Sequence, residues 1–504
     1  MLNPILIGFG TSYGKGILES AFHGASLGHC LSVCIDKNLK PDLEAKEHEW
    51  LNHRACQFGD YPTDWRGFDP IDEELIEKMR DCETVFMRMM DRLERGKMIP
   101  YQQRRRAYLR HLRYWNHIIE HKKINLYLST NYPHECFDFV LYHLCKLRGI
   151  QTVMLRAGLM SIPDVLFLDY DWEKPSPGLE EKFEELKKKY EGKSENEILL
   201  APKFEKEIIA QTKSVSGGSL PWYMSHSSSP KAEVAVTQAI EKKKWRKMVF
   251  GMLAGDPINF ARHSLNFMSR VFTAEFWAKR IEILQRKRAT VHMRRFYNSH
   301  ADIPDLSKKY IYLPLHYQPE CTTCPMAGEY RDQLLIAELL HACLPEDVLI
   351  YVKEHPMQGE VQRSIEFYRD LISIPTVRLV PLGFDSTALL ENSLAVATAT
   401  GTAGFEALFR GVPFLMFGHR FMQYGPGVFP IRTEEDCKKA IEKILSGERG
   451  ASFRDLKIFL KAIEEVSIEG YVEEANRDVS RITEEECVRN VGGAIKKDIS
   501  CLAV

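Results

Sequence analysis

Residues 394–417 read LAVATATGTAGFEALFRGVPFLMF, and this stretch decides the fold class. The apolar run 394–397 predicts a strand, the small residues after it predict a tight turn, and residues 405–410 predict a helix. Gly-Val-Pro then leads to a second apolar run at 414–417. A strand, a crossover helix and a second strand make a βαβ unit, which indicates a parallel sheet.

The same alternation continues on both sides of this stretch. Short apolar runs alternate with amphipathic helical patterns, as expected when helices cover a parallel sheet. We predict further strands at 310–315, 348–352 and 377–380, and further helices at 332–344, 386–392, 434–446 and 451–485.

A second set of βαβ signals opens the chain. Residues 4–7 predict a strand, a glycine-rich turn follows, and a helical pattern runs to residue 28 before a strand at 31–35. Strands at 125–129 and 152–155 flank a further amphipathic helix. The first glycines do not have the GxGxxG spacing of a dinucleotide-binding loop. We therefore predict two doubly wound, Rossmann-like α/β domains, with the ligand site in the cleft between them.

These patterns predict four parts of the chain. They are an N-terminal α/β domain (1–172), a helical insertion that completes the N-terminal half (173–305), a C-terminal α/β domain (306–450) and closing helices (451–504). Within the insertion, residues 241–300 carry 14 Lys and Arg against four acidic residues, with large apolar side chains between them. This pattern suits an anionic membrane surface or an acidic acceptor, and equally a solvated helical pair whose aromatic residues face the core.

Composition excludes several classes of protein. The chain has 504 residues and a formal net charge of -1, so it is not a basic protein that coats nucleic acid. No run of 18 apolar residues exists, and the first residues lack the positive region of a signal peptide, so we expect a cytoplasmic protein without a membrane-spanning helix. The 12 cysteines are scattered. Cys321 and Cys324 form a single CxxC without a second pair, so we expect reduced thiols and no bound metal.

Two strand ends predict a phosphate site. The turn at 400–406 opens a helix, where free N–H groups and the helix dipole attract an anion, although a plain βα turn with a Thr N-cap would look the same. Lys353 and His355 follow the strand at 348–352, and we expect this tip to lie beside the tip at 400 and meet the same phosphate. The predicted donor-binding residues are Lys353, His355, Pro356, Thr400, Gly401, Thr402, Ala403, Gly404 and Glu406.

Two other strand ends offer groups for proton transfer or nucleophilic attack. His316 and Glu320 follow the first strand of the C-terminal domain, and His134 and Glu135 follow the strand at 125–129. A transfer reaction needs a carboxylate or an imidazole near the reacting carbon, so these four are the predicted catalytic residues. For each of them alone, a structural hydrogen bond is an equal alternative.

Four motifs resemble the bacterial capsule polysaccharide biosynthesis family, which includes Kdo transferases of capsule export systems. The resemblance covers roughly 125–155 and 310–430, and it does not extend to 175–300 or beyond 450. It implies a GT-B fold whose C-terminal domain holds the donor nucleotide and whose N-terminal domain holds the acceptor. The motifs are 126–155, YLPLHYQPECTTCP at 312–325, YVKEHP at 351–356 and TATGTAGFEALFRGVPFLMF at 398–417.

The resemblance also implies residue roles and an activity. Lys353, His355 and Pro356 match the strand-end motif that meets the donor phosphate, and the turn at 400–406 matches the donor loop. We expect a metal-independent glycosyltransferase without a cofactor, using CMP-Kdo or another CMP-sugar on a cell-surface glycan or glycolipid. The Asp-Tyr-Asp triplet at 169–171 lies in the first domain, so no metal-binding DxD motif is placed beside the donor. The alternatives are a sugar-nucleotide epimerase of the same fold and a non-catalytic scaffold of a polysaccharide assembly complex.

Overall fold

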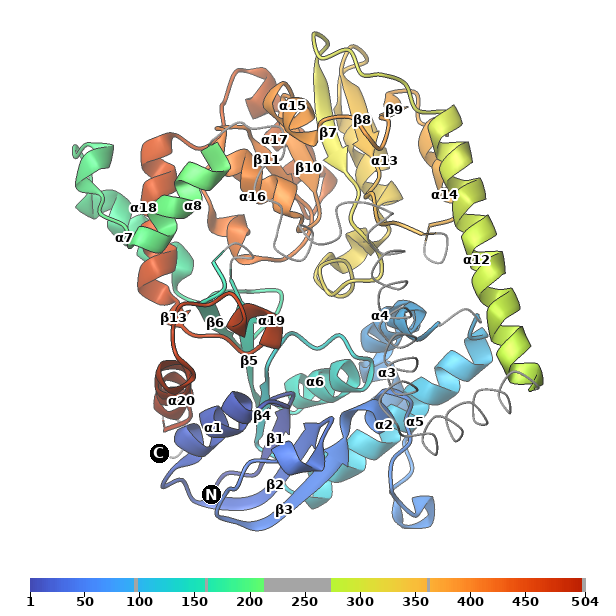
Figure 1. The fold of residues 1–504 in the computed structure, drawn as a ribbon, viewed down its shortest axis with the longest axis vertical. Helices are drawn as coiled ribbons and strands as arrows, with labels where there is room; N and C mark the ends of the chain where they lie inside the picture. The colour runs from blue at the N-terminus through green and yellow to red at the C-terminus, as the bar shows by residue number, and fades with distance from the viewer. Residues whose placement is uncertain (95–97, 159–161, 213–272, 360–362, 501–504) are drawn as a thin grey trace, which may run out of the picture.

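The computed structural model describes residues 1–94, 98–158, 162–212, 273–359 and 363–500. These residues form two α/β halves, the N-terminal half at the bottom of Figure 1 and the C-terminal half at the top. Each half has one largely parallel sheet with helices on both faces. The predicted fold class of two doubly wound α/β domains is therefore confirmed.

The N-terminal sheet has the strand order β13-β6-β5-β4-β1-β2-β3. The pairs from β5 to β3 are parallel, whereas β6 is antiparallel to β5 and β13 is antiparallel to β6. The strands are β1 (Pro4–Ile7), β2 (Leu27–Cys34), β3 (Ala45–Asn52), β4 (Leu126–Ser129), β5 (Gln151–Ala157), β6 (Val165–Asp169) and β13 (Ile468–Glu469).

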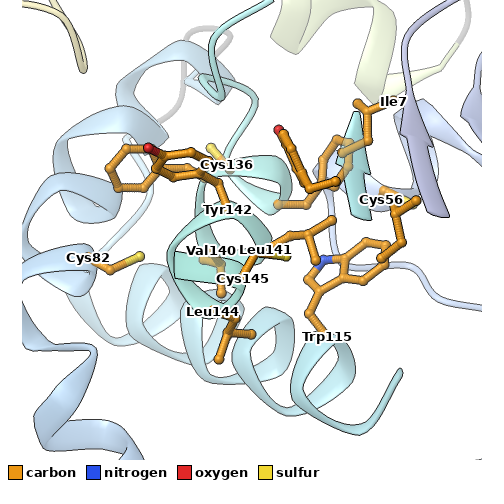
Figure 2. Close-up of a cluster of buried hydrophobic side chains, with 14 of the residues drawn as sticks. Ile7, Cys56, Cys82, Trp115, Cys136, Val140, Leu141, Tyr142, Leu144 and Cys145 are labelled. Carbon is orange, nitrogen blue, oxygen red and sulfur yellow. The ribbon is translucent and has the colours of Figure 1, made fainter. Parts of the chain in front are cut away.

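Both faces of this sheet are covered by amphipathic helices. On one face, Trp115 of α5 and Leu141 of α6 pack with Ile7 of β1 in a buried hydrophobic cluster (Figure 2). On the other face, α1 lies beside α20 from the end of the chain. The helices of this half are α1 (Ser12–Phe22), α2 (His53–Gln57), α3 (Glu73–Lys78), α4 (Arg80–Met89), α5 (Tyr101–His121), α6 (Phe137–Leu147), α19 (Glu474–Arg477) and α20 (Glu484–Ser500).

The C-terminal sheet is parallel throughout and has the order β12-β11-β10-β7-β8-β9. The prediction that the strand tips near 353 and 400 lie side by side is wrong, because β7 separates β8 from β10. The residues after β7 therefore lie between the two predicted phosphate-binding tips. The strands are β7 (Tyr310–Pro314), β8 (Leu349–Lys353), β9 (Val377–Leu379), β10 (Ala395–Thr398), β11 (Phe414–Met416) and β12 (Val428–Pro430).

Helices cover both faces of the C-terminal sheet as well. The core on one face joins β7 and β8 to α13 (Leu334–Cys343), α14 (Ile365–Ser373) and α17 (Glu434–Leu445). The core on the other face joins the same strands to α15 (Ser386–Glu391) and α16 (Thr402–Phe409). The 3₁₀ turns of the chain are η1 (Lys37–Leu39), η2 (Trp65–Gly67), η3 (Met90–Leu93), η4 (Glu195–Glu197), η5 (Gly328–Arg331) and η6 (Phe421–Tyr424).

Other helices connect the halves. The long α12 (Ala274–Ser299) runs beside both of them (Figure 1), contacting α14 above and donating from Arg286 to the carbonyl of Glu94 below. On the opposite side, α7 (Leu179–Lys189) and α8 (Pro202–Thr212) share a core with α18 (Phe453–Val466), α16 and β6. The predicted boundaries at 172, 305 and 450 stay predictions. Residues 241–272 of the predicted basic segment lie outside the described residues.

No helix in the described part of the chain is both long enough and apolar enough to cross a membrane. The cysteines in the same part are all free thiols, most of them buried.

Candidate functional site

The donor loop predicted at 400–406 does open a helix at a strand end. β10 ends at Thr398, Gly401 takes the N-cap position of α16, and no side chain caps the helix. Gly404 donates its amide to Gly401, but in the described structure no acceptor meets the amides of Thr402 and Ala403. Because the positive end of the helix dipole lies at these amides, they can bind an anion.

His316, which follows β7, holds this loop in place. Its Nε2 lies 2.6 Å from the Thr398 hydroxyl and accepts from the Thr400 amide at 3.2 Å. The Thr400 hydroxyl donates to the carbonyl of Thr322 at 2.7 Å, and Thr400 is fully buried. The hydroxyl of Thr400 therefore links the donor loop to the segment after β7.

Burial and neighbouring cations keep His316 neutral. Burial lowers the pKa of His316 to about 3, and the positive charges of Arg363 and Arg420 act in the same direction. Since Nε2 accepts from the Thr400 amide, the imidazole proton sits on Nδ1. A neutral imidazole of this kind can donate a hydrogen bond to a phosphate, but it is a poor proton acceptor near pH 7.

Lys353 lies at the end of β8, where its ammonium meets the turn before α15. Its Nζ donates to the carbonyl of Phe384 at 2.7 Å and to the hydroxyl of Ser386 at 2.6 Å. Burial lowers the pKa of Lys353. An ammonium has three N–H donors, so two of them fix the turn before α15.

The residues that follow β8 support the segment after β7. Glu354 is buried and pairs with Arg363 at 2.9 Å, and Arg363 donates to the carbonyl of His316 at 2.8 Å. The imidazole of His355 packs 5.5 Å from the ring of Tyr317, and burial lowers its pKa to about 4. Pro356 is exposed and its carbonyl accepts from Arg294 of α12.

Two predicted donor-binding residues have other surroundings. A Cβ on Gly404 would lie 2.2 Å from the ring of Phe414, so glycine is required there for packing between α16 and β11. Burial raises the pKa of Glu406, and a nearby carboxylate, Glu207 of α8, acts in the same direction. Glu406 therefore faces the α8 side of its helix.

In the N-terminal half, His134 and Glu135 lie in the loop between β4 and α6. The carboxylate of buried Asp138 accepts both of their backbone amides, at 3.1 and 2.7 Å. His134 donates from Nδ1 to the carbonyl of Tyr132, and its Nε2 lies 3.3 Å from Glu135. Gln57 donates to Glu135. The loop therefore holds one imidazole and one carboxylate in direct contact.

The charge state of this pair depends on burial and on neighbours. Burial, together with the nearby charge of Arg92, lowers the pKa of His134 to about 4. Burial alone would raise the pKa of Glu135, but His134 and His53 hold it below its usual value. Glu135 is therefore favoured in its ionised form, which accepts hydrogen bonds.

The two halves meet at the segment that follows β7. Arg92 of η3 donates from Nη2 to the carbonyl of Cys324 at 2.7 Å, and its charge lowers the pKa of both Glu135 and Glu320. Glu320 accepts from the Thr322 hydroxyl at 2.9 Å, and burial outweighs these contacts and raises its pKa. Predicted catalytic carboxylates from both halves are therefore brought to one junction around Arg92.

The CxxC pair has a packing role at this junction. Cys324 is buried in the N-terminal core beside Cys136, and Cys321 packs against the same core. Burial raises the pKa of Cys321 to about 12, so its thiol stays protonated. The metal-type clusters found among the described residues contain no cysteine.

Sequence reasoning missed three arginines and one carboxylate of this site. Arg92 and Arg363 carry no motif of their own, and Glu354 lies within the YVKEHP motif but was given no role. Arg420 donates to the carbonyl of Thr400 at 3.1 Å. Its position in the loop that follows the apolar strand β11 is a signal that sequence reasoning can use.

The two α/β halves, with the candidate groups at strand ends and at the junction of the halves, have a GT-B-like fold. Residues 273–436 match the family model described as capsule polysaccharide biosynthesis protein. No curated protein matches the chain.

The chain is similar to several solved structures at low sequence identity. The KpsC β-Kdo 2,7 transferase of Thermosulfurimonas dismutans is 12% identical, with a TM-score of 0.29 over 81% of this chain and 95% of that chain. The UDP-GlcNAc 2-epimerase of Methanocaldococcus jannaschii is 12% identical, with a TM-score of 0.25 over 92% of this chain and 99% of that chain. The sucrose-phosphate synthase of Thermosynechococcus elongatus is 10% identical, with a TM-score of 0.24 over 99% and 98%. At these scores the likenesses carry no statement about what this chain binds.

Proposed function

We propose that the protein is a nucleotide-sugar-dependent glycosyltransferase that adds a sugar to a cell-surface glycan or glycolipid in capsule polysaccharide biosynthesis. One observation carries the proposal: the segment 316–324 joins the donor loop to the N-terminal half. His316 bonds the loop that opens α16, and Cys324 accepts from Arg92. A group transfer needs both substrates at one place, and here both halves contribute side chains. The match of residues 273–436 to a capsule biosynthesis family supports the same proposal.

The donor phosphate is proposed to bind at the start of α16. The amides of Thr402 and Ala403 supply uncommitted donors, and His316 supplies a neutral N–H. Lys353 and His355 lie at the end of β8, on the other side of the β7 tip. Groups fixed in advance around the leaving phosphate stabilise the charge that grows on it, which is usually the largest contribution to catalysis.

We assign the general base for the acceptor hydroxyl to Glu320. Burial raises its pKa, which brings its basicity closer to neutral pH. Glu135 is held by Gln57 and His134, and its pKa is lowered, so this pair orients the acceptor.

Matched amide variants test the two carboxylates. Glu320→Gln should lower kcat by about 10²–10⁴ with nucleotide affinity unchanged. Glu135→Gln should mainly raise the KM of the acceptor. A Glu320→Gln enzyme within tenfold of the wild-type kcat would remove Glu320 from the role of base.

The finer proposal is a CMP-activated sugar donor, CMP-Kdo or a relative, which rests on the sequence resemblance to a family that includes Kdo transferases. Titration calorimetry with CMP, UDP and GDP identifies the base, with His355→Gln as the site variant and the exposed His300→Gln as its control. CMP binding that weakens only in the His355 variant is the expected result. Binding of no nucleotide indicates the scaffold, and conversion of a UDP-sugar without any acceptor indicates the epimerase.

The reaction is proposed to need no metal, since cationic side chains and helix amides can neutralise the leaving phosphate. Activity should survive exhaustive treatment with EDTA. Loss of activity that Mg²⁺ or Mn²⁺ restores would contradict this part of the proposal.

We also propose that α12 docks to an anionic membrane at the inner face of the cell envelope. Trp277, Ile281 and Leu284 follow helical spacing and are 56%, 52% and 56% exposed, with Lys287 and Arg288 exposed beside them. Apolar side chains flanked by cations are the pattern of a helix that lies in a membrane interface.

Vesicle flotation tests the docking of α12. The full chain should float with vesicles that contain phosphatidylglycerol and not with phosphatidylcholine alone. Lys287→Gln/Arg288→Gln should abolish flotation, whereas Lys438→Gln/Lys439→Gln on α17, also exposed, should not. Flotation that is equal in both double variants rules out docking through α12.

A further inference from the structure

The geometry points to a site that the proposed transfer reaction does not use: we propose that Asp69, His117 and His121 bind a divalent first-row transition-metal ion of the Zn²⁺ type. His117 and His121 lie one turn apart on α5, so their side chains share a face of the helix. Asp69 comes from the loop after η2. One ligand atom from each of the three lies within 4.8 Å of the others.

The three side chains already converge on one point. His117 Nδ1 lies 2.9 Å and His121 Nε2 lies 2.6 Å from the same oxygen, Oδ2 of Asp69. The centroids of the two imidazole rings lie 4.0 Å apart, and the ring planes are inclined by 30°. Ligand atoms around a tetrahedral Zn²⁺ with bonds of about 2.0–2.2 Å are about 3.3 Å apart. An ion therefore fits after these contacts lengthen by less than about 1 Å.

The loop that carries Asp69 is fixed on α5 independently of any ion. Arg113 donates to the carbonyls of Asp69, Trp65 and Phe68 at 3.0, 2.8 and 2.5 Å. The ring of Phe68 packs 4.1 Å from that of His117. A ligand set whose supporting residues are already locked loses little conformational freedom on binding.

The chemistry of the set selects the kind of ion. Two imidazole nitrogens and one carboxylate suit Zn²⁺ and its first-row neighbours, whereas Mg²⁺ and Ca²⁺ prefer oxygen ligands alone. His121 is the last residue of α5, where the negative end of the helix dipole attracts a cation. The side chains of Asp69 and His121 are 52% and 54% exposed, so water can fill the remaining coordination positions.

A second cluster with similar residue types is already paired with the side chain of a lysine. His29, Glu47 and Glu49 lie within the same distance limits, but the ammonium of Lys122 is 2.7 Å from Glu49 and 3.5 Å from Glu47. A metal ion there would have to displace or repel this ammonium. The cluster is therefore a built-in comparison for the site on α5.

Metal at Asp69 would join the loop after η2 to α5 and so stabilise the N-terminal half. α5 carries Trp115, whose ring lies 6.1 Å from that of Phe137 at the start of α6, directly after the loop with His134 and Glu135. The inference concerns stability and does not depend on the proposed glycosyltransferase activity.

Zinc binding to the untagged full chain tests the inference. After chelator treatment and dialysis, ZnCl₂ alone is added in a calorimetric titration, and CoCl₂ is added to follow its visible absorption. We expect one ion per chain, a raised Tm, and a loss of affinity of at least about 100-fold in His121→Ala and Asp69→Asn. His23→Ala, an exposed histidine outside both clusters, and His29→Gln should bind as the wild type does.

Three results would overturn the inference. They are the absence of saturable Zn²⁺ binding by the wild type, equal affinity in His121→Ala, and loss of binding in His29→Gln alone. Because the side chain of His121 is 54% exposed and its contacts in the described structure are with Asp69 and His117, the His121 variant should fold normally. Circular dichroism confirms its folding.

Discussion

Removing one partner of the buried ion pair between Glu354 and Arg363 should destabilise the C-terminal domain and loosen the donor loop. The two side chains are 3% and 1% exposed, and their charged atoms lie 2.9 Å apart. Tyr368 donates to the same Glu354 carboxylate at 2.7 Å, and Arg363 donates to the carbonyl of His316. We choose Arg363→Met, Glu354→Gln and the double variant.

The magnitude follows from the burial of the pair. A buried charge left without its partner costs about 3–5 kcal/mol. A domain of about 150–250 residues loses about 2–4 °C in Tm per kcal/mol, so the transition of this domain should fall by about 6–20 °C. The double variant leaves no charge unpaired, so it should lose less than the sum of the single variants, with a coupling energy of at least about 2 kcal/mol.

Differential scanning calorimetry of the full chain measures the transitions, and hydrogen exchange over residues 398–404 reports on the donor loop. Arg369→Met is the matched control, because Arg369 pairs with Glu366 on the surface of α14, where an ion pair is worth about 0–1 kcal/mol. The reasoning fails if Arg363→Met melts like Arg369→Met, or if the two single effects simply add.

Two further predictions concern packing and pH. Gly404→Ala should lower the free energy of unfolding by about 1–3 kcal/mol in urea denaturation, because the new Cβ would lie 2.2 Å from the ring of Phe414. Gly493→Ala is the control and should not destabilise the protein, because Gly493 lies in a helix with open space around it. Lowering the pH from 7 to 5 should lower Tm. Burial holds the pKa of His111 and of His316 at about 3 in the folded protein, whereas a histidine in the unfolded chain has a pKa near 6.5. Between these values only the unfolded chain binds protons at the two histidines, so a fall in pH favours unfolding. Each histidine then costs about 2 kcal/mol at pH 5, and a Tm that is flat over this range would contradict the assignment.

Local pattern predicted most of the elements. The stretch 394–417 forms β10, α16 and β11, because an apolar run, a turn of small residues and a helical period all act over a few residues. β13 has two residues and pairs with β6, more than 300 positions earlier in the chain, so no local signal marks it. Strand β3 was missed because all but one of its residues are exposed or half-exposed, and Lys46, Glu47 and Glu49 are charged.

The candidate site was harder to predict than the fold. Sequence indicates which residues follow strands, but the order of strands in a sheet is set by long-range packing, and so the position of β7 between β8 and β10 was not foreseen. Gly404 was interpreted as room for a phosphate, whereas the contact with Phe414 explains it. The sequence does not indicate a role for Arg92, because its partner Cys324 lies in the segment after β7, far from η3 in the chain.

The return of the chain to its first half affects how domain motion can be observed. β13 extends the N-terminal sheet, α20 packs on α1, and Gln151 of β5 bonds Asp498 near the end of α20. Dyes attached near residues 1 and 498 would therefore both lie on the N-terminal half. The efficiency of energy transfer between them would stay constant even if the halves rotate on binding a donor. A pair that can register such a rotation needs one dye on α5 and the other on α17.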